Sequence, residues 1–170
     1  MNSKKNLVLL GMMASGKSTV GALVSKKLGI KFYDIDKMIE DRMQMSIAEI
    51  FEKKNENFFR SLEEKITLQT LQNKNSIISL GGGAFFNEKI RKEIIMNHIS
   101  FWLQCEAKIL LKRIRKNNKR PLANKLTNNE LIKLIDKRKK IYSKAKFKIN
   151  CDRLNKNEIV KNIIELYETI

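Results

Sequence analysis

"GMMASGKS", residues 11–18, decides the fold of this chain, because it fits the pattern G-x-x-x-x-G-K-[ST] at every fixed position. The apolar run "NLVLL" (6–10) precedes it, and "VGALVSKKLG" (20–29) follows with apolar residues at helical spacing. The two glycines of the pattern let successive backbone N–H groups point inward, and the start of the helix adds the positive end of a dipole. We therefore predict a phosphate-binding loop between a buried strand and a helix.

The other residues of the loop indicate what it binds. Lys17 is expected to reach the β- and γ-phosphates of a nucleotide, and the Ser18 hydroxyl is expected to ligate Mg²⁺. A glycine-rich turn with a structural lysine is the alternative interpretation. The residues of this stretch that we expect to contact ATP are Gly11, Ala14, Ser15, Gly16, Lys17, Ser18 and Thr19.

Strands and helices are predicted to alternate along the rest of the chain. Short apolar runs indicate four more buried strands, at 31–35, 76–80, 99–105 and 147–151. Capping signals and helical periodicity indicate helices that begin near Ser46, Asn55, Asn87, Glu106, Thr127 and Asn155. This alternation predicts an α/β three-layer sandwich, with a five-stranded parallel sheet flanked by helices.

Composition limits the class of protein. The chain has 170 residues, of which 42% are hydrophobic and 31% charged, as in an ordinary globular domain. No apolar run approaches the roughly 18 residues that a membrane span needs, and there is no signal-peptide pattern. Two cysteines, Cys105 and Cys151, and the single His98 are too few for a zinc site. We expect one cytoplasmic domain over residues 1–170, monomeric, without a membrane partner, and with His98 at the surface.

The charge is strongly positive and uneven. The net charge is +17, and the halves 1–85 and 86–170 carry +4 and +13. Within 108–148, 16 basic residues accompany only Glu130 and Asp136. Such a block could bind nucleic acid or surround a polyanionic small molecule, or it could be a solvated lysine-rich surface.

Two further stretches carry chemistry. "FYDID" places Asp34 and Asp36 at the end of the second strand, where strand ends border the ligand crevice of a parallel sheet. We expect both carboxylates to point the same way, one toward Mg²⁺ and one toward an acceptor hydroxyl; a helix N-cap plus a surface charge is the alternative. "SLGGGAFF" (79–86) holds three of the seven glycines directly after a predicted strand. Such a triplet indicates that something approaches the main chain closely there.

Taken together, these segments resemble the shikimate kinase family. The resemblance covers essentially the whole chain, because the family's motifs occur in order as "GMMASGKST", "FYDID", "SIAEIF", "FFRSLEE", "SLGGGA", "RPLA" and "DKRKKIY". It implies a P-loop kinase fold with a mobile lid at about 115–127 and substrate-binding helices at about 36–62. It also implies transfer of the ATP γ-phosphate to the 3-hydroxyl of shikimate, a step of aromatic amino-acid biosynthesis, with Mg²⁺ as cofactor.

The resemblance assigns the catalytic roles to Lys17, Asp36 and Arg120. Asp36 would bind the shikimate hydroxyls and orient or deprotonate the attacking one. Arg120, in the lid, would swing over the transferring phosphate, and Arg113 would stack near adenine. Asp34 would assist Mg²⁺ through water.

The remaining implied residues surround the acceptor. Arg60 and Arg138 would hold its carboxylate, and a guanidinium suits this task because it can bond bidentately. Phe51 and Phe59 would pack on the ring of shikimate. The main-chain N–H groups of the turn would approach its oxygens, at Gly81, Gly82 and Gly83. Ser79, just before them, would help to order the Mg²⁺ shell.

The chain departs from the family pattern in places. Ala14 stands where the loop commonly has a glycine, Ala123 where a second leucine is frequent after "RPL", and Lys156 where proline is common. Two other functions stay open from the residues: a nucleotide or gluconate-type kinase, and an ATP-dependent factor that binds nucleic acid through the basic half. Few aromatic residues interleave that basic block, so we expect no nucleic-acid partner.

Overall fold

The computed structural model describes residues 5–116, 123 and 126–169, and it is built around one parallel sheet. The strand order is β2-β3-β1-β4-β5, so β1 lies at the centre with β3 and β4 beside it. The register places Val8 of β1 next to Ile78 of β3 and Ser100 of β4. The five strands are β1 (Leu7–Leu10), β2 (Lys31–Asp34), β3 (Ser76–Ser79), β4 (Ile99–Gln104) and β5 (Phe147–Asn150). The predicted five-stranded parallel sheet is confirmed.

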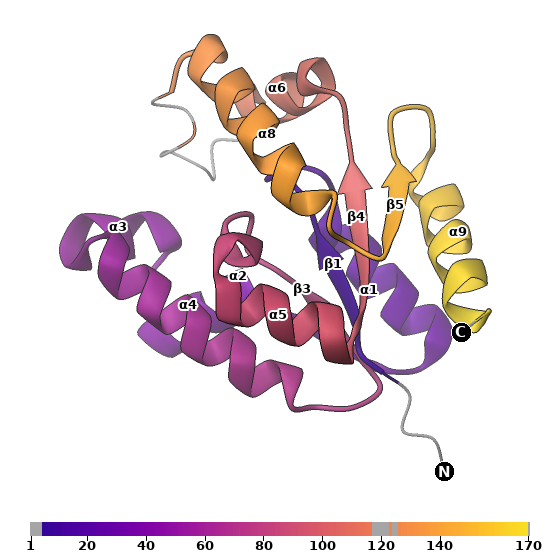
Figure 1. Cartoon of the computed structure of the whole chain (residues 1–170). Helices are drawn as coiled ribbons and strands as arrows, with labels where there is room; N and C mark the ends of the chain where they lie inside the picture. The colour runs from indigo at the N-terminus through magenta and orange to yellow at the C-terminus, as the bar shows by residue number, and fades with distance from the viewer. Residues whose placement is uncertain (1–4, 117–122, 124–125, 170) are drawn as a thin grey trace.

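Helices cover both faces of this sheet (Figure 1). α1 packs against α9 on one side, and α4 packs against α5 on the other. The described helices are α1 (Lys17–Leu28), α2 (Ile35–Met43), α3 (Ile47–Lys54), α4 (Glu56–Leu71), the 3-10 helix η1 (Ala84–Phe86), α5 (Glu88–Asn97), α6 (Ala107–Arg115), α8 (Asn128–Tyr142) and α9 (Lys156–Glu168). The three-layer arrangement that the alternation of strands and helices predicted is therefore present.

Local signals explain where several helices begin and end. Capping boxes open three of them, with Ser46, Thr127 and Asn155 as the N-cap residues. Gly29 ends α1 in the left-handed conformation, with φ 65°, a role that suits a residue without a Cβ. The central strand β1 is fully buried, as expected of a strand that is covered on both faces.

The chain turns into a helix earlier than the sequence indicated. β2 ends at Asp34, and α2 begins at the next residue. Asp34 is the N-cap of α2, and its side chain accepts a hydrogen bond from the Lys37 N–H at 3.3 Å. Asp36 lies in the first turn of this helix, so the expectation of two carboxylates on one strand end is wrong.

His98 is also placed differently from the expectation. It caps the C-terminus of α5 and leads directly into β4, so its side chain is packed inside and only 8% exposed. The expectation of a surface histidine is therefore wrong. Trp102, Cys105 and Cys151 are buried. None of the described helices is both long enough and apolar enough to cross a bilayer.

Candidate active site

The phosphate-binding loop lies between β1 and α1, at the carboxyl end of the central strand. Gly11 has φ 147°, and a Cβ there would lie 2.7 Å from the Leu103 carbonyl oxygen of β4. Gly16 has φ 95° and is the N-cap of α1. Both positions therefore require glycine. Gly16 requires it for its backbone conformation, and Gly11 for its conformation and because a Cβ would have no space there. Ala14 also has a positive φ, 63°, at the position where the sequence departs from the family's usual glycine.

Lys17 and Ser18, the last two residues of the loop pattern, differ in burial and in their contacts. Lys17 is buried, and its ammonium group donates to the carbonyl oxygens of Gly11 and Met12 at 2.9 and 3.0 Å. The exposed Ser18 hydroxyl donates to a carboxylate oxygen of Asp34. Strand β2 and helix α1 thus bring together two oxygen-bearing side chains that the sequence predicted as metal ligands. Hard divalent cations such as Mg²⁺ prefer such oxygen ligands.

The turn Gly81–Gly83 explains the glycine triplet. A Cβ on Gly81 would lie 2.5 Å from Glu63 Oε1 and 2.6 Å from Asp36 Oδ1. The two carboxylates therefore rest against the main chain at a point where any side chain would displace them. Asp36 reaches this place from the first turn of α2, and Glu63 from the middle of α4.

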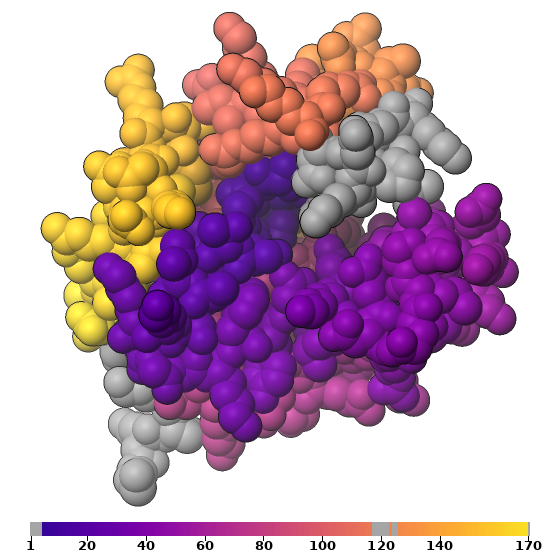
Figure 2. Space-filling view, turned by 180° about the vertical axis from the view of Figure 1, so that it is seen from behind, coloured from indigo at the N-terminus to yellow at the C-terminus, as the bar shows by residue number. Residues whose placement is uncertain are grey.

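Two arginines lie against the other glycines of the turn. A Cβ on Gly83 would lie 2.5 Å from Arg60 Nη1, and one on Gly82 would lie 3.0 Å from Arg138 Nη1. The close approach that the sequence predicted is therefore made by charged side chains from α2, α4 and α8. Figure 2 shows a hollow in the surface of the molecule, between the indigo and violet segments.

Arg60 is held from two directions. Its Nη1 donates to Glu63 Oε2 at 2.7 Å, and Nε and Nη2 face Glu56 Oε1 at 3.3 and 3.2 Å. Glu63 is 3% exposed, so burial raises its pKa; Arg60 opposes this shift, while the charge of Asp36 adds to it. Glu56 is exposed, and ion pairs of that kind contribute only about 0–1 kcal/mol. The Arg60 Nη1 group is thus held by the buried Glu63, whereas Nε and Nη2 can exchange the exposed Glu56 for another carboxylate.

Two aromatic rings flank this arginine. Phe51 of α3 and Phe59 of α4 pack with ring centroids 4.7 Å apart. The Arg60 guanidinium lies over both rings, 5.1 Å from the Phe59 centroid and 6.0 Å from the Phe51 centroid. The structure therefore brings Phe51, Phe59 and Arg60 together, as the resemblance implied.

Helix α8 contributes Arg138 and a residue that the sequence did not single out. Arg138 Nη1 lies 3.4 Å from the Met12 sulfur in the phosphate-binding loop, which is a weak acceptor. The Tyr142 hydroxyl donates to the Gly82 carbonyl at 2.5 Å. The sequence does show that Arg138 and Tyr142 are four residues apart and would therefore lie on one face of a helix. This spacing does not identify what they contact, because Gly82 is 60 residues from Tyr142 in the chain.

The other predicted residues divide into three groups. Arg113 reaches the phosphate-binding loop and donates to the Ala14 carbonyl at 3.3 Å. Thr19 is exposed beside Ser18, whereas the hydroxyl groups of the buried Ser15 and Ser79 are turned into the protein. Arg120 and most of the predicted lid lie outside the described residues.

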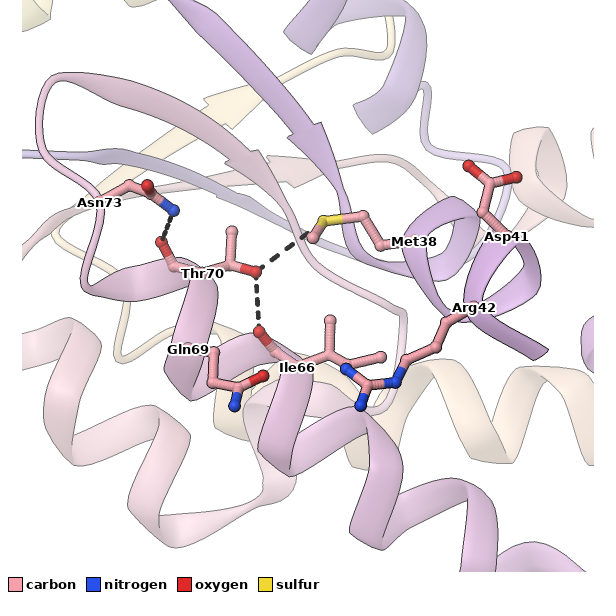
Figure 3. Close-up of a pocket in the computed structure, with 7 residues that line it drawn as sticks. All are labelled: Met38, Asp41, Arg42, Ile66, Gln69, Thr70 and Asn73. Carbon is pink, nitrogen blue, oxygen red and sulfur yellow. Dashed lines mark hydrogen bonds between the residues drawn. The ribbon is translucent and has the colours of Figure 1, made fainter.

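A cavity of about 530 Å³ lies elsewhere, between α2 and α4 (Figure 3). Its lining residues bond to one another: the Thr70 hydroxyl donates to the Ile66 carbonyl at 2.7 Å, and Asn73 donates to the Thr70 carbonyl at 2.8 Å. It contains none of the predicted site residues, and it lies near the C-terminal ends of both helices, away from the turn. We therefore take the phosphate-binding loop and the glycine turn as the candidate active site.

Comparison with known proteins gives a consistent result. The family model described as shikimate kinase matches residues 13–168. A shikimate kinase of Bartonella quintana (strain Toulouse) is 39% identical over 162 residues, which cover 95% of this chain and 77% of that protein. One of Bacillus subtilis (strain 168) is 39% identical over 171 residues, covering 95% and 88%. The structure of an Acinetobacter baumannii shikimate kinase in complex with shikimate matches with a TM-score of 0.91 at 27% identity, over 97% of this chain and 93% of that one.

Proposed function

Because the chain belongs to the shikimate kinase family, we propose that it transfers the γ-phosphate of ATP to the 3-hydroxyl of shikimate, giving shikimate 3-phosphate and ADP. One observation carries this proposal: two arginines and two carboxylates converge on a glycine turn beside a phosphate-binding loop. A cyclic acid with several hydroxyl groups offers the complementary groups, since its carboxylate suits the arginines and its hydroxyls suit the carboxylates.

The acceptor carboxylate would be bound by Arg60 and Arg138. Arg60 would keep its bond to the buried Glu63 and exchange the exposed Glu56 for the substrate. Arg138 faces the thioether of Met12, so a carboxylate would be a much stronger acceptor than the one it has. The rings of Phe51 and Phe59 would pack against the apolar face of the substrate ring.

Asp36 would receive the acceptor hydroxyl and orient it toward the γ-phosphate. Phosphoryl transfer depends mainly on positioning and on neutralising charge, so no covalent nucleophile is needed. Lys17 would exchange the loop carbonyls for phosphate oxygens, since its ammonium group already lies within the loop. Arg113 would remain beside the nucleotide through its contact with Ala14. Arg120, in the predicted lid, would contribute a further positive charge at the transferring phosphate.

The residues present fit a magnesium ion. Ser18 and Asp34 share a hydrogen bond and provide oxygen atoms at the rim of the loop. Groups of three or more His, Cys, Asp or Glu that could hold a metal are absent among the described residues, which agrees with an ion held mainly by phosphates and water. When bound, Mg²⁺ would neutralise part of the phosphate charge. Ser18 and Asp34 would fix its place relative to Lys17.

A coupled assay of ADP formation tests the proposal. We expect ADP to form with shikimate and Mg-ATP, with equimolar shikimate phosphate carrying the new group on the 3-oxygen by NMR. Gluconate, nucleoside monophosphates and DNA should not replace shikimate. ATP turnover that depends on nucleic acid and ignores shikimate would refute the proposal, and turnover with a nucleotide or gluconate acceptor would favour the related kinases.

Arg60→Ala tests the assigned substrate contact. The variant should weaken shikimate binding about 10²-fold, because a charge-assisted bidentate contact is lost, and should leave ATP affinity nearly unchanged. Arg42→Ala is a matched control, since Arg42 is an exposed arginine of α2 outside the site. Equal losses for both substrates would show that Arg60 has a structural role instead.

A further inference from the structure

Tyr142 is the last residue of α8 and is almost completely buried beneath the glycine turn. The residue is 2% exposed, and its hydroxyl donates to the Gly82 carbonyl at 2.5 Å. Its ring packs against Trp102 of β4, with centroids 6.0 Å apart. The tyrosine therefore joins three parts of the molecule: the end of α8, the central sheet and the turn.

Arg138 lies one helical turn before Tyr142 and on the same face of α8. Its guanidinium lies above Gly82, at 3.0 Å from where a Cβ would stand, and also contacts Met12. The arginine and the tyrosine thus meet the same glycine from one helix, the first through its charged end and the second through a hydrogen bond. Among the described residues, Arg138 has no ion pair of its own that would fix its position.

We propose that Tyr142 is a positioning residue for the acceptor carboxylate: its hydroxyl fastens the end of α8 to the Gly82 carbonyl and thereby holds Arg138 over the turn. The inference rests on the proposed function, because it takes Arg138 as a partner of that carboxylate. Tyr142 itself touches no substrate in this arrangement. It acts by setting the distance between a helix and a turn that belong to distant parts of the sequence.

The chemistry of the hydroxyl suits a permanent anchor. Burial raises the pKa of Tyr142 to about 12, and Arg138 opposes this shift only in part. The group therefore keeps its proton, and remains a donor to the carbonyl, at any pH where the protein is expected to work. A backbone carbonyl that loses a buried donor is left unsatisfied, so the anchor is costly to remove.

Tyr142→Phe removes the hydroxyl and keeps the ring on Trp102. We expect the KM for shikimate to rise about tenfold and the KM for ATP to stay within twofold of wild type. Tyr167→Phe is the matched control, because the Tyr167 hydroxyl also donates to a backbone carbonyl, that of Lys5, at 2.9 Å, far from the site. This control should leave both KM values unchanged. Titration of shikimate by calorimetry in the absence of ATP measures binding without turnover.

A double-mutant cycle with Arg138→Met separates positioning from general stability. If Tyr142 acts through Arg138, Tyr142→Phe should change the shikimate KM less than twofold in the Arg138→Met background. Equal effects of Tyr142→Phe in both backgrounds, or equal losses for shikimate and ATP, would overturn the inference. A large effect of Arg138→Met with none from Tyr142→Phe would overturn this inference and leave the proposed function intact. No effect of Arg138→Met on the shikimate KM would instead refute the role assigned to Arg138.

Discussion

Gly81→Ala should impair catalysis while leaving the fold intact. The new methyl carbon would lie 2.5 Å from Glu63 Oε1 and 2.6 Å from Asp36 Oδ1. A carbon–oxygen contact needs about 3.3 Å, so each carboxylate must retreat by roughly 0.7–0.8 Å. Both atoms are ends of side chains rather than backbone, and they can move without disturbing the sheet. The φ of Gly81 is outside the left-handed region, so alanine brings no backbone strain.

The loss can be estimated from that displacement. A misplacement of about 1 Å at a reacting group can cost about 10²-fold in rate. We therefore expect kcat/KM for shikimate to fall about 10- to 100-fold, which corresponds to roughly 1.4–2.7 kcal/mol of transition-state stabilisation. The free energy of unfolding should change by less than about 1 kcal/mol, since removing a glycine also reduces the freedom of the unfolded chain.

The assay is the coupled measurement of ADP at saturating ATP, with thermal unfolding followed in parallel. Gly29→Ala is the control, because Gly29 has φ 65° at the end of α1 and nothing within 4 Å of its Cβ position. That variant should lose stability by about 1 kcal/mol and keep kcat/KM. Wild-type kinetics in Gly81→Ala would refute the assignment of the Asp36 carboxylate to the reaction. Unfolding of Gly81→Ala would show that the turn, rather than the carboxylates, requires the glycine.

Three further outcomes follow from the contacts. Asp34→Asn keeps an N-cap acceptor for α2 but removes a negative charge beside Ser18. The Mg²⁺ concentration needed for half-maximal activity should therefore rise several-fold. An unchanged Mg²⁺ titration curve would contradict the assignment of Asp34 to the metal. Ala14→Gly should raise the free energy of unfolding, measured by urea titration, by up to about 1 kcal/mol, because a residue with a Cβ is strained at φ 63°. A free energy of unfolding below that of wild type would show that Ala14 is not strained. Burial lowers the pKa of His98 below 6.5, with Glu93 opposing this and Lys5 adding to it. The unfolded chain then takes up the proton first as pH falls below 6.5, so wild type should lose more stability than His98→Gln between pH 7 and pH 5; parallel curves would show that His98 does not titrate this way.

Much of the fold follows from short segments of sequence. The five predicted strands end within one residue of the observed ends, because each is bounded by turn or helix signals. The inner strands β1, β3 and β4 are buried as predicted. The edge strands β2 and β5 are mostly part-exposed or exposed, so the prediction of buried strands at 31–35 and 147–151 is wrong. Helix α2 was harder to recognise, since "IDKMIEDRM" follows β2 without an intervening loop and carries more charge than apolar residues. Its start displaced Asp36 from a strand end to a helix, which changed the geometry of the site without removing the residue from it.

The two halves of the site differ in how far the sequence determines them. The phosphate-binding loop is one continuous segment, so its residues, spacing and flanking elements could all be predicted together. The acceptor half is assembled from α2, α4, α8 and the glycine turn, and only the resemblance to a family joined Arg60 to Arg138. The Tyr142 hydrogen bond to Gly82 depends on how α8 lies against the turn, which no local pattern encodes.

The charges around the glycine turn bear on the net positive charge of the chain. Arg60 and Arg138 balance Asp36 and Glu63, so this cluster is formally neutral when all four groups are ionised. Adding a substrate carboxylate to a neutral, partly buried cluster would be costly unless positive charge stood nearby. Lys17 and Arg113 provide such charge at the phosphate-binding loop. Part of the positive charge of the chain thus lies at the candidate site, on Lys17, Arg60, Arg113 and Arg138.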